Sequence, residues 1–449
     1  MRPLAQFLSR GAISVRLPAA LLFGIFAAVS IEAEDEAPVS PADLHRFMPQ
    51  SWNLETMEHQ LWVSPQGVGD GSSRLKALGS IQTAIEQARP GTVIFVTAGT
   101  YPESLALARS AEIASGTDES PIFLVSVDGC EAAEIKPGRD VTNLDANRIQ
   151  NWAVVGFHFV GAGSTTDGDN SPIKIGASNL IEGEPARNWW VAGNTFSGTG
   201  HDGSKAYHAR NITWLGNHYD GEWGQEACDN VAVGVSDATA DQNHFVFNTV
   251  AGTSGYSAIT VKYGSNHFLI AQNEFTINTG TRLPLRGAMI RVGGNGDLKR
   301  FVDRLPHETD PAFSVLTASH VRVMRNRFSG VCGINVELYG SRNSEIGDND
   351  LVNPNAPIEI QATEARLGDD PQGNPYRWTA RNNRIVGNRI SAPEENSFGG
   401  RLEGEAFSVA DNRSDRVFEY PTGAAAVRPA IDALIDTLLQ TTSAAASLR

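Results

Sequence analysis

A short unit recurs along the chain, in which an apolar strand is followed by glycine or a polar residue and then by asparagine. NWWVAGNTF, NITWLGNHY and NHFLIAQNEF are three examples. Subtracting successive residue numbers gives gaps of 23, 31, 25, 53, 23 and 39 residues between the asparagines that mark the unit, which are Asn194, Asn217, Asn248, Asn273, Asn326, Asn349 and Asn388. A unit that repeats every 20 to about 50 residues is typical of a solenoid or a propeller.

One buried strand and one turn asparagine in each unit predict a right-handed parallel β-helix, an all-β fold, over residues 60–420. In such a stack each asparagine can hydrogen-bond backbone groups of its own turn and the asparagine of the next coil. The gap of 53 residues corresponds to two coils, or to one coil that carries a long loop. A solenoid can reach this length without splitting into two domains.

Helical patterns flank the predicted coils at both ends. Ser80 is a suitable N-cap for a short helix over residues 81–88, whose apolar residues share one face. We expect this helix to cover the N-terminal end of the core, as solenoids require. In the tail, residues 421–449, apolar residues at helical spacing follow Pro429 and predict a helix packed on the last coil or on the side of the stack.

The first residues of the chain predict export. Three arginines precede an apolar run over residues 17–31, and small residues follow it. This order is typical of a secretory signal peptide, here residues 1–33, and the run is short for a membrane span. An uncleaved membrane anchor is the alternative. We expect a secreted or periplasmic protein in which residues 34–59 form a linker or an arm.

Composition narrows the choice of partner. The formal net charge is −15, with 51 acidic and 36 basic residues, which argues against a general binder of nucleic acid or of membrane surfaces. An acidic ligand remains compatible with this charge, because basic residues can line one face of a solenoid. The three cysteines do not have the spacing of a metal site.

Two predicted strands carry candidate chemistry, AITVKYGSN at 258–266 and AMIRVGGN at 288–295. Matching VKYGSN with IRVGGN places Lys262 opposite Arg291, and the alternation of side chains along a strand then puts both cations on the outer face. Lys174, in SPIKIGASN at 171–179, occupies the same register. The alternative is a set of solvated surface cations.

A lysine beside a fixed guanidinium is expected to have a lowered pKa, so that it can act as a base near neutral pH. The arginine keeps its proton and presents a fork that suits a carboxylate. Together the two groups could remove the proton α to a uronic carboxylate and neutralise the charge that develops there. This step starts both β-elimination and C5 epimerisation of a uronate polymer.

At these residues the chain resembles the β-helical polysaccharide lyases that include chondroitinase B and related alginate lyases, which have a pectin-lyase-like solenoid fold. In that family the catalytic lysine is followed by an asparagine four residues later, by an N-x-F turn, by Gly-Thr and by an arginine. Here Lys262 is followed by Asn266, then by Asn273-Glu274-Phe275 and Gly280-Thr281. The coil resemblance spans residues 60–420, and the catalytic one only about 258–292.

The family's arginine has two candidates in this chain. Arg286 is nearer to the family's order after Gly-Thr, whereas Arg291 stacks better in the strand alignment. The resemblance and the strand register together imply Lys262 and Arg291 as catalytic residues. They imply Lys174, Arg286 and Asn266 as residues that bind substrate.

The family usually binds calcium through carboxylates just before the catalytic lysine, but residues 253–257 contain no acid here. Glu226 and Asp229, one predicted coil earlier, could substitute, so the metal stays open and calcium is one candidate. The Asp-Pro-His-Asp motif of β-helical alginate epimerases is absent from the sequence. His201-Asp202-Gly203 and His208 lie on preceding coils and are typical of turns.

We therefore expect a secreted β-helix protein that acts on an acidic, uronate-containing polysaccharide such as alginate. A lyase that cleaves by β-elimination is the first hypothesis. A uronate C5-epimerase and a non-catalytic β-helix, which binds glycan or builds a surface structure, are the alternatives. We expect a monomer with an acidic polysaccharide as partner, no nucleic-acid partner and no membrane span after signal cleavage.

Overall fold

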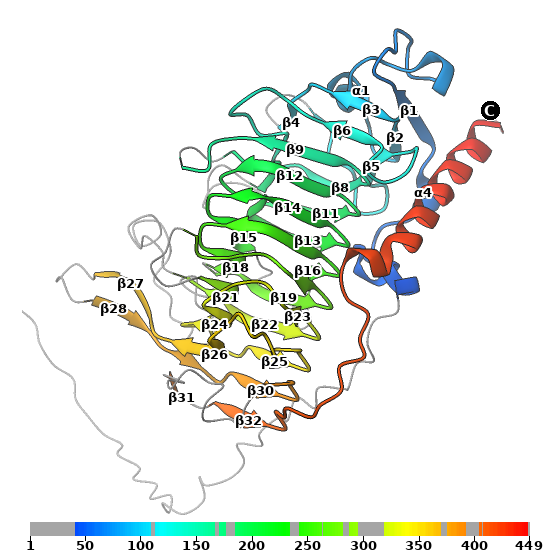
Figure 1. Cartoon of the computed structure of the whole chain (residues 1–449). Helices are drawn as coiled ribbons and strands as arrows, with labels where there is room; N and C mark the ends of the chain where they lie inside the picture. Colours follow the sequence, from blue (N-terminus) through cyan, green and yellow to red (C-terminus); the bar gives the residue numbers. More distant parts are fainter. Residues whose placement is uncertain are drawn as a thin grey trace, which may run out of the picture. The chain divides into compact units, whose positions relative to one another are not determined.

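The computed structural model of the chain is a parallel β-helix, in which three parallel ladders of strands enclose one core (Figure 1). The predicted fold class is therefore confirmed. The structure describes residues 41–108, 113–166, 170–176, 185–233, 242–262, 264–281, 287–294, 318–369, 375–391, 404–405 and 407–447. The predicted signal peptide, residues 1–33, lies outside this range.

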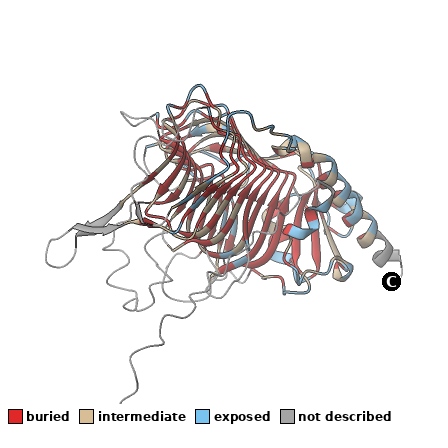
Figure 2. Ribbon diagram, turned by 90° about the horizontal axis from the view of Figure 1, so that it is seen from below, coloured by how far each residue is buried: buried red, intermediate tan, exposed pale blue. Residues whose placement is uncertain are grey.

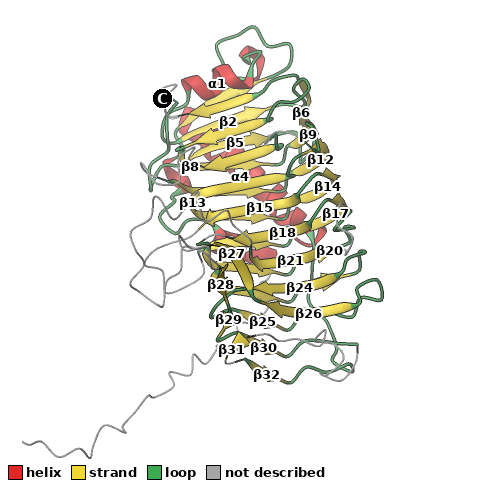
Figure 3. Ribbon diagram, turned by 90° about the vertical axis from the view of Figure 1, so that its left-hand side faces the viewer, coloured by secondary structure: helices red, strands yellow, loops and turns green. Residues whose placement is uncertain are grey.

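Most coils contribute one strand to each ladder (Figure 3). The first ladder consists of β4 (Leu105–Ala108), β7 (Leu144–Asn147), β10 (Ile173–Gly176), the first half of β13 (Ser204–Leu215), β15 (Glu226–Val233), β18 (Ser257–Lys262), β21 (Ala288–Gly293), β24 (Ile334–Tyr339) and β26 (Ile358–Thr363). This ladder carries the candidate site.

The second ladder consists of β1 (His59–Val63), β2 (Thr92–Val96), β5 (Ile122–Ser126), β8 (Gln150–Val155), β11 (Ala186–Ala192), the second half of β13, β16 (Asn243–Val246), β19 (Asn266–Ala271), β22 (Ser319–Met324), β25 (Glu345–Gly347), β30 (Arg384–Val386) and β32 (Ser408–Ala410). The third consists of β3 (Gly99–Tyr101), β6 (Ala133–Ile135), β9 (His158–Ala162), β12 (Thr195–Gly200), β14 (His218–Trp223), β17 (Thr249–Ser254), β20 (Glu274–Phe275) and β23 (Arg327–Phe328). Two small pairs complete the strands, β27 (Ala365–Asp369) with β28 (Pro375–Trp378) and β29 (Ala380–Arg381) with β31 (Gly404–Glu405).

The asparagines of the repeat form one column of hydrogen bonds, in equivalent turns between the second and third ladders. Asn217 is typical: its side-chain Nδ2 and its backbone N donate to Oδ1 of Asn248 at 3.1 and 2.9 Å, and the same Nδ2 donates to the carbonyl of Val191 at 2.9 Å. The column starts at Asn194 and continues one residue beyond the predicted set, to Asn412. The prediction that these asparagines lie in equivalent turns of successive coils is therefore confirmed.

A left-handed backbone conformation explains the glycine or polar residue that precedes each asparagine. All eight preceding residues have φ between 53° and 67°, namely Gly193, Gly216, Phe247, Gln272, Arg325, Asp348, Gly387 and Asp411. Glycine adopts this conformation without cost, and the other residues require support from the column. Asn273 donates directly to Asn326, so the gap of 53 residues is one coil with a long loop.

The core is filled by the inward side chains of the three ladders, and the strands are largely buried (Figure 2). Aromatic rings stack from coil to coil at centroid separations of 4.8 to 6.5 Å, in the order Phe159, Phe196, Tyr219, Phe245, Phe275 and Phe328. Such contacts add to the hydrophobic stabilisation of each coil on its neighbour.

The N-terminal end of the core is covered by α1 (Ile81–Gln87), as predicted. Ser80 caps the helix by accepting a hydrogen bond from Thr83 N at 3.2 Å. Glu103 accepts further hydrogen bonds from the backbone N of Ile81 and Gln82, at 2.9 and 3.0 Å. The carboxylate thus lies at the positive end of the helix, where it is stabilising.

The described part of the predicted linker, residues 41–59, is an arm that packs on the outside of the second ladder. It contains two short helices, η1 (Pro41–Phe47) and η2 (Leu54–Thr56), and a third, η3 (Arg74–Lys76), follows β1. Phe47 lies edge-on to His244 at 5.1 Å, and Trp52 lies edge-on to Phe123 at 5.6 Å. Apolar contacts, which the polar composition of the segment concealed, fix it to the coils.

The tail helix α4 (Ala424–Ser447) packs on the side of the stack rather than on the last coil (Figure 1). Its buried apolar residues lie at helical spacing, at Val427, Ile431, Ile435 and Leu438. Val427 and Ile431 contact the turn glycines Gly216 and Gly193. Among the described residues, no helix is both long enough and apolar enough to cross a membrane.

Replacing Gly216 with alanine is expected to loosen α4, at a cost of roughly 1–3 kcal/mol from backbone strain and overpacking together. Gly216 has φ +59°, and an added Cβ would lie 2.5 Å from Cγ2 of Val427. Hydrogen exchange of the α4 amides should become faster. Gly129→Ala is the control, because Gly129 has φ +110° but an added Cβ would have no atom within 4 Å. Equal exchange in both variants would contradict this account of α4.

Candidate functional site

The candidate site lies on the outer face of the first ladder, where β13, β15, β18 and β21 are stacked (Figure 3). Alternation along each strand places Cys228, Ile259 and Ile290 in the core. The residues that follow them face outward and lie in register, Asp229 opposite Thr260 and Thr260 opposite Arg291. Lys262, at the end of β18, lies opposite Val231.

The predicted register of Lys262 opposite Arg291 is wrong by two residues, since Arg291 lies opposite Thr260. The sequence alignment matched Gly264 with Gly293, but Gly293 belongs to β21 whereas Gly264 lies in the turn after β18. A shift of two residues leaves the face of a strand unchanged. Lys262 and Arg291 are therefore on the same outer face, as predicted, in neighbouring columns.

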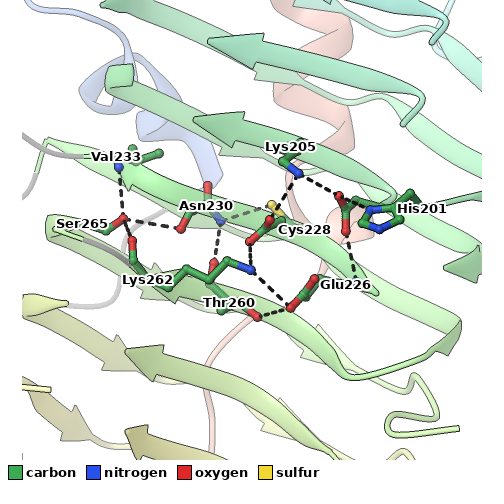
Figure 4. A network of polar contacts seen from close by, with 11 residues as sticks. His201, Lys205, Glu226, Cys228, Asn230, Val233, Thr260, Lys262 and Ser265 are labelled. Atoms are coloured by element: carbon green, nitrogen blue, oxygen red, sulfur yellow. Dashed lines mark hydrogen bonds and ion pairs between the residues drawn. The ribbon is translucent and has the colours of Figure 1, made fainter. Parts of the chain in front are cut away.

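Lys262 is held by two carboxylates from the preceding coil (Figure 4). Its Nζ lies 2.9 Å from Oδ1 of Asp229 and 3.6 Å from Oε1 of Glu226, and its side chain is only 17% exposed. Thr260 donates to the same Oε1 of Glu226 at 3.1 Å. Lys262 thus lies in a compact ion-pair network, and not beside an unbalanced positive charge.

This network reverses the expected shift of the lysine pKa. Burial by itself would lower the pKa of Lys262, but Asp229, Glu226 and Asp202 outweigh burial and raise it above its ordinary value. The expectation of a pKa lowered by Arg291 is therefore wrong for the protein as it stands. The acids that determine the direction of the pKa shift come from the coils before Lys262.

A second part of the network joins Asp202 to His201 and Lys205. Oδ2 of Asp202 lies 3.1 Å from Nδ1 of His201 and 3.5 Å from Nζ of Lys205. Lys205 also lies 3.7 Å from Oδ2 of Asp229, and so links Asp202 to the carboxylates around Lys262. The backbone N of Glu226 donates to Oδ1 of Asp202 at 3.3 Å.

Two carboxyl groups of the network are shifted in opposite directions. Burial raises the pKa of Glu226 to about 7, and its neighbours Asp229 and Asp202 add to the rise against the effects of Lys262 and Arg291. Burial also opposes ionisation of Asp202, but the hydrogen bond with His201 and the charge of Lys205 bring its pKa below the ordinary value. The two shifts thus separate the groups: Asp202 favours the ionised form, and Glu226 the protonated form, more than an ordinary carboxyl group does.

Three buried acids of this network are placed so that they could hold a divalent cation. One oxygen each from Asp202, Glu226 and Asp229 lies within 4.8 Å of the others, and all three residues are buried. Carboxylate oxygens are the ligands that calcium prefers. Residues 253–257, where the family resemblance places the acids, contain none, and the three convergent carboxyl groups come from the coil of Glu226 and Asp229 and from the coil of Asp202 before it.

Two further predicted residues, Lys174 and Arg291, lie in one column of the first ladder. Lys174 lies opposite Lys205, and therefore in the same column as Asp229 and Arg291, as its strand position predicted. Arg291 donates through Nε to Oε2 of Glu337 at 2.7 Å. Its guanidinium retains further N–H donors, as the planar fork of an arginine has five.

Asn266, predicted to bind substrate, begins β19 in the second ladder and is only 4% exposed. Its carbonyl accepts a hydrogen bond from Asn243 Nδ2 at 3.1 Å, so the residue contributes to the packing of a turn. Arg286, the second choice for the catalytic arginine, lies outside the described residues. The sequence argument missed Lys205, and it took His201 and Asp202 for turn residues, whereas all three belong to this network. The alternation in Ser204-Lys205-Ala206-Tyr207 could have placed Lys205 on the outer face.

No family model and no curated protein matches this chain. Among solved structures, it is similar to the A-module of a mannuronan C-5 epimerase from Azotobacter vinelandii, with 16% identity, 80% of this chain and 95% of that chain covered, and a TM-score of 0.44. It is also similar to a lacto-N-biosidase from Eubacterium ramulus, with 11% identity, coverages of 78% and 68%, and a TM-score of 0.43. An alginate lyase from Paenibacillus follows, with 15% identity, coverages of 74% and 94%, and a TM-score of 0.35.

Proposed function

We propose that this protein acts on an acidic polysaccharide by removing the proton α to a uronate carboxylate. The observation that carries the proposal is the setting of Lys262. It faces outward from the first ladder, with Lys205 two coils before it and Arg291 in the next coil, and it is held by Glu226 and Asp229. A group able to transfer a proton and several cations are thus gathered on one outer face.

The cations have a direct role in this reaction. Lys205 and Arg291 offer positive charge to the substrate carboxylate, which stabilises the charge that develops when the α proton leaves. Arg291 suits this role because a guanidinium stays protonated and can bind a carboxylate through two N–H groups. Lys262 transfers the proton, since a lysine amine, unlike a guanidinium, can exist in the neutral form.

Lys262 must lose its proton before it can act as a base. The three carboxylates that raise its pKa, Asp229, Glu226 and Asp202, are the same three whose oxygens converge. A divalent cation such as calcium, held by these three residues, would supply the positive charge that offsets them and leave burial to lower the pKa of Lys262. We therefore include calcium in the proposal as a cofactor.

Elimination and epimerisation share the loss of the C5 proton. In elimination the bond to the C4 oxygen then breaks, and in epimerisation a proton returns to the opposite face of the sugar ring. His201, oriented by Asp202, is our candidate for the group that donates a proton in either case. We place β-elimination first and epimerisation second, as in the sequence hypothesis.

A second candidate function is glycoside hydrolysis, which the opposite pKa shifts of Glu226 and Asp202 favour. Glycosidases use one carboxyl group that stays protonated as the acid and one that stays ionised. Glu226, with a pKa raised to about 7, suits the first role, and Asp202 suits the second.

A panel of uronate polymers, tested with calcium and with a chelator, separates these functions. We expect ultraviolet absorbance from unsaturated uronate, and its loss with the chelator. Deuterium uptake at C5 in D₂O without new ends would indicate an epimerase, and new reducing ends without absorbance would indicate a hydrolase. Binding without turnover on any polymer would leave only the non-catalytic alternative and would refute the proposed enzyme.

The pH profile provides a second discriminator, because the two mechanisms have opposite slopes. A base must be neutral, so a lyase that uses Lys262 should become faster as the pH rises. An acid must be protonated, so a hydrolase that uses Glu226 should become slower as the pH rises through about 7. Glu226→Gln should raise the calcium concentration that the lyase requires, since it removes the charge of one of the three proposed ligands. The same substitution should inactivate the hydrolase.

A further inference from the structure

A pattern spanning two neighbouring strands occurs twice on the outer face of the first ladder, once on each side of Lys262. One strand carries an apolar residue, a cation, an apolar residue and a glycine, and the strand of the next coil carries a charged residue, an apolar residue and a tyrosine. The first copy is Ile173-Lys174-Ile175-Gly176 followed by Lys205-Ala206-Tyr207, and the second is Ile290-Arg291-Val292-Gly293 followed by Glu337-Leu338-Tyr339. The register places Gly176 opposite Tyr207 and Gly293 opposite Tyr339.

In both copies the cation contacts the tyrosine ring of the next coil. Nζ of Lys174 lies 5.2 Å from the ring centroid of Tyr207, and Cζ of Arg291 lies 5.9 Å from that of Tyr339. The glycine leaves room for the ring in the first copy, because a Cβ on Gly176 would lie 2.5 Å from Cδ1 of Tyr207. Each copy thus presents an aromatic ring and a cation side by side, on partly exposed residues.

The two tyrosines lie in the same column as Lys262, at equal distances from it. Tyr207 is opposite Val231, which is opposite Lys262. Continuing the register of β18 and β21 places Lys262 opposite Gly293, which is opposite Tyr339. Each tyrosine is therefore two coils from Lys262, or about 10 Å at a strand spacing of about 4.8 Å.

We infer that Tyr207 and Tyr339, each with its neighbouring cation, form the outer subsites for a uronate chain that lies along the stack over Lys262. One pyranose residue of an extended chain advances by about the spacing of one coil. The tyrosines therefore meet the sugars two positions before and two positions after the sugar at Lys262. The C–H face of a sugar packs on the ring. Lys174 attracts the carboxylate of the sugar at Tyr207, and Arg291, one coil before Tyr339, attracts the carboxylates of the chain between Lys262 and Tyr339.

This inference rests on the proposed function and makes it more specific. A site with matched subsites on both sides of the reacting sugar favours the interior of a polymer over a chain end or a small uronide. It also assigns Arg291 a binding role next to Tyr339, in addition to its charge beside Lys262. The minimum chain that fills the site is five sugars, which is the reacting sugar with two on either side.

The test compares kcat/KM on uronate oligomers of defined length for the wild type, Tyr207→Ala and Tyr339→Ala. We expect the wild-type value to rise with length up to five sugars and then to level off. Each alanine variant should lose about tenfold on chains of five or more sugars, the order expected for one aromatic contact, and little on a trimer. Tyr207→Phe and Tyr339→Phe should keep the wild-type values, because the ring and not the hydroxyl binds the sugar.

Tyr420→Ala is the matched control, since Tyr420 also lies against an arginine, Arg325 at 5.3 Å, but outside the first ladder. Equal losses on trimers and longer chains, or no loss at all, would overturn the subsites while leaving the proposed reaction in place. If the wild type turns over no uronate polymer, the proposed function fails separately. In that case calorimetric titration with a uronate hexamer tests the subsites. Weaker binding by both alanine variants than by the wild type supports the subsites, and unchanged or absent binding overturns them.

Discussion

Lys262→Arg is expected to lower the turnover of a uronate polymer by a factor on the order of 10²–10⁴, which is the usual contribution of a group that transfers a proton. The guanidinium keeps a positive charge beside Asp229 and Glu226, so the buried carboxylates remain compensated. It cannot release a proton at working pH, so it cannot act as a base. The measurement is kcat/KM on the polymer, with thermal unfolding as the check that the fold is intact.

Lys262→Ala is the companion variant and separates catalysis from stability. It should be as inactive as Lys262→Arg, and it should also lose about 3–5 kcal/mol, because removing one partner of a buried ion pair leaves an uncompensated charge. Full activity of Lys262→Arg would contradict proton transfer by Lys262. The role of that residue would then be purely electrostatic, and His201 would become the first candidate for the base.

Asn273→Ala is expected to lower the free energy of unfolding by about 3–6 kcal/mol, since it leaves several buried partners unpaired at about 1–3 kcal/mol each. Oδ1 of Asn273 accepts from the backbone N and from Nδ2 of Asn248, at 2.7 and 3.1 Å. Its Nδ2 donates to the carbonyl of Phe245 at 2.8 Å and to Oδ1 of Asn326 at 2.9 Å. The residue is fully buried, so water cannot replace these bonds.

Denaturant unfolding of this variant against Asn355→Ala gives the comparison. Asn355 is exposed, and its side chain donates a hydrogen bond to the carbonyl of Ser329 at 3.2 Å. Its replacement should change stability by no more than about 0.5 kcal/mol, as is usual at surface positions. A similar small effect for Asn273→Ala would mean that the asparagine column accompanies the fold without stabilising it.

The coil architecture could be predicted from the sequence because its causes are local and repeated. An apolar strand, a residue that tolerates positive φ and a buried asparagine recur within a few positions of one another, and each copy predicts the same turn. The capping helix was predictable for the same reason, since Ser80 and the apolar face that follows it are adjacent in the chain. The outward face of Lys262, Arg291 and Lys174 followed from alternation alone.

The arm and the tail helix show where local patterns reach their limit. The polar composition of residues 34–59 indicates a linker or an arm equally well, and only the positions of His244 and Phe123 in space show that Phe47 and Trp52 are packed. The helix after residue 421 was predicted, but its place was not. Gly193 and Gly216, more than two hundred residues earlier in the chain, provide the surface on which it packs.

The sequence by itself determined the β-helix and the face on which the cations lie, whereas the tertiary structure decided which groups meet there and with what charge. The register between coils is set by backbone pairing of the strands. The similar sequences around Gly264 and Gly293 suggested an alignment that differs from this register by two residues. The sign of the pKa shift of Lys262 depends on burial and on carboxylates from two earlier coils. The net pKa shift depends on distances in space between charged groups. Asp229 and Asp202 lie 33 and 60 positions before Lys262 in the chain, so the sequence does not reveal that they are close to it.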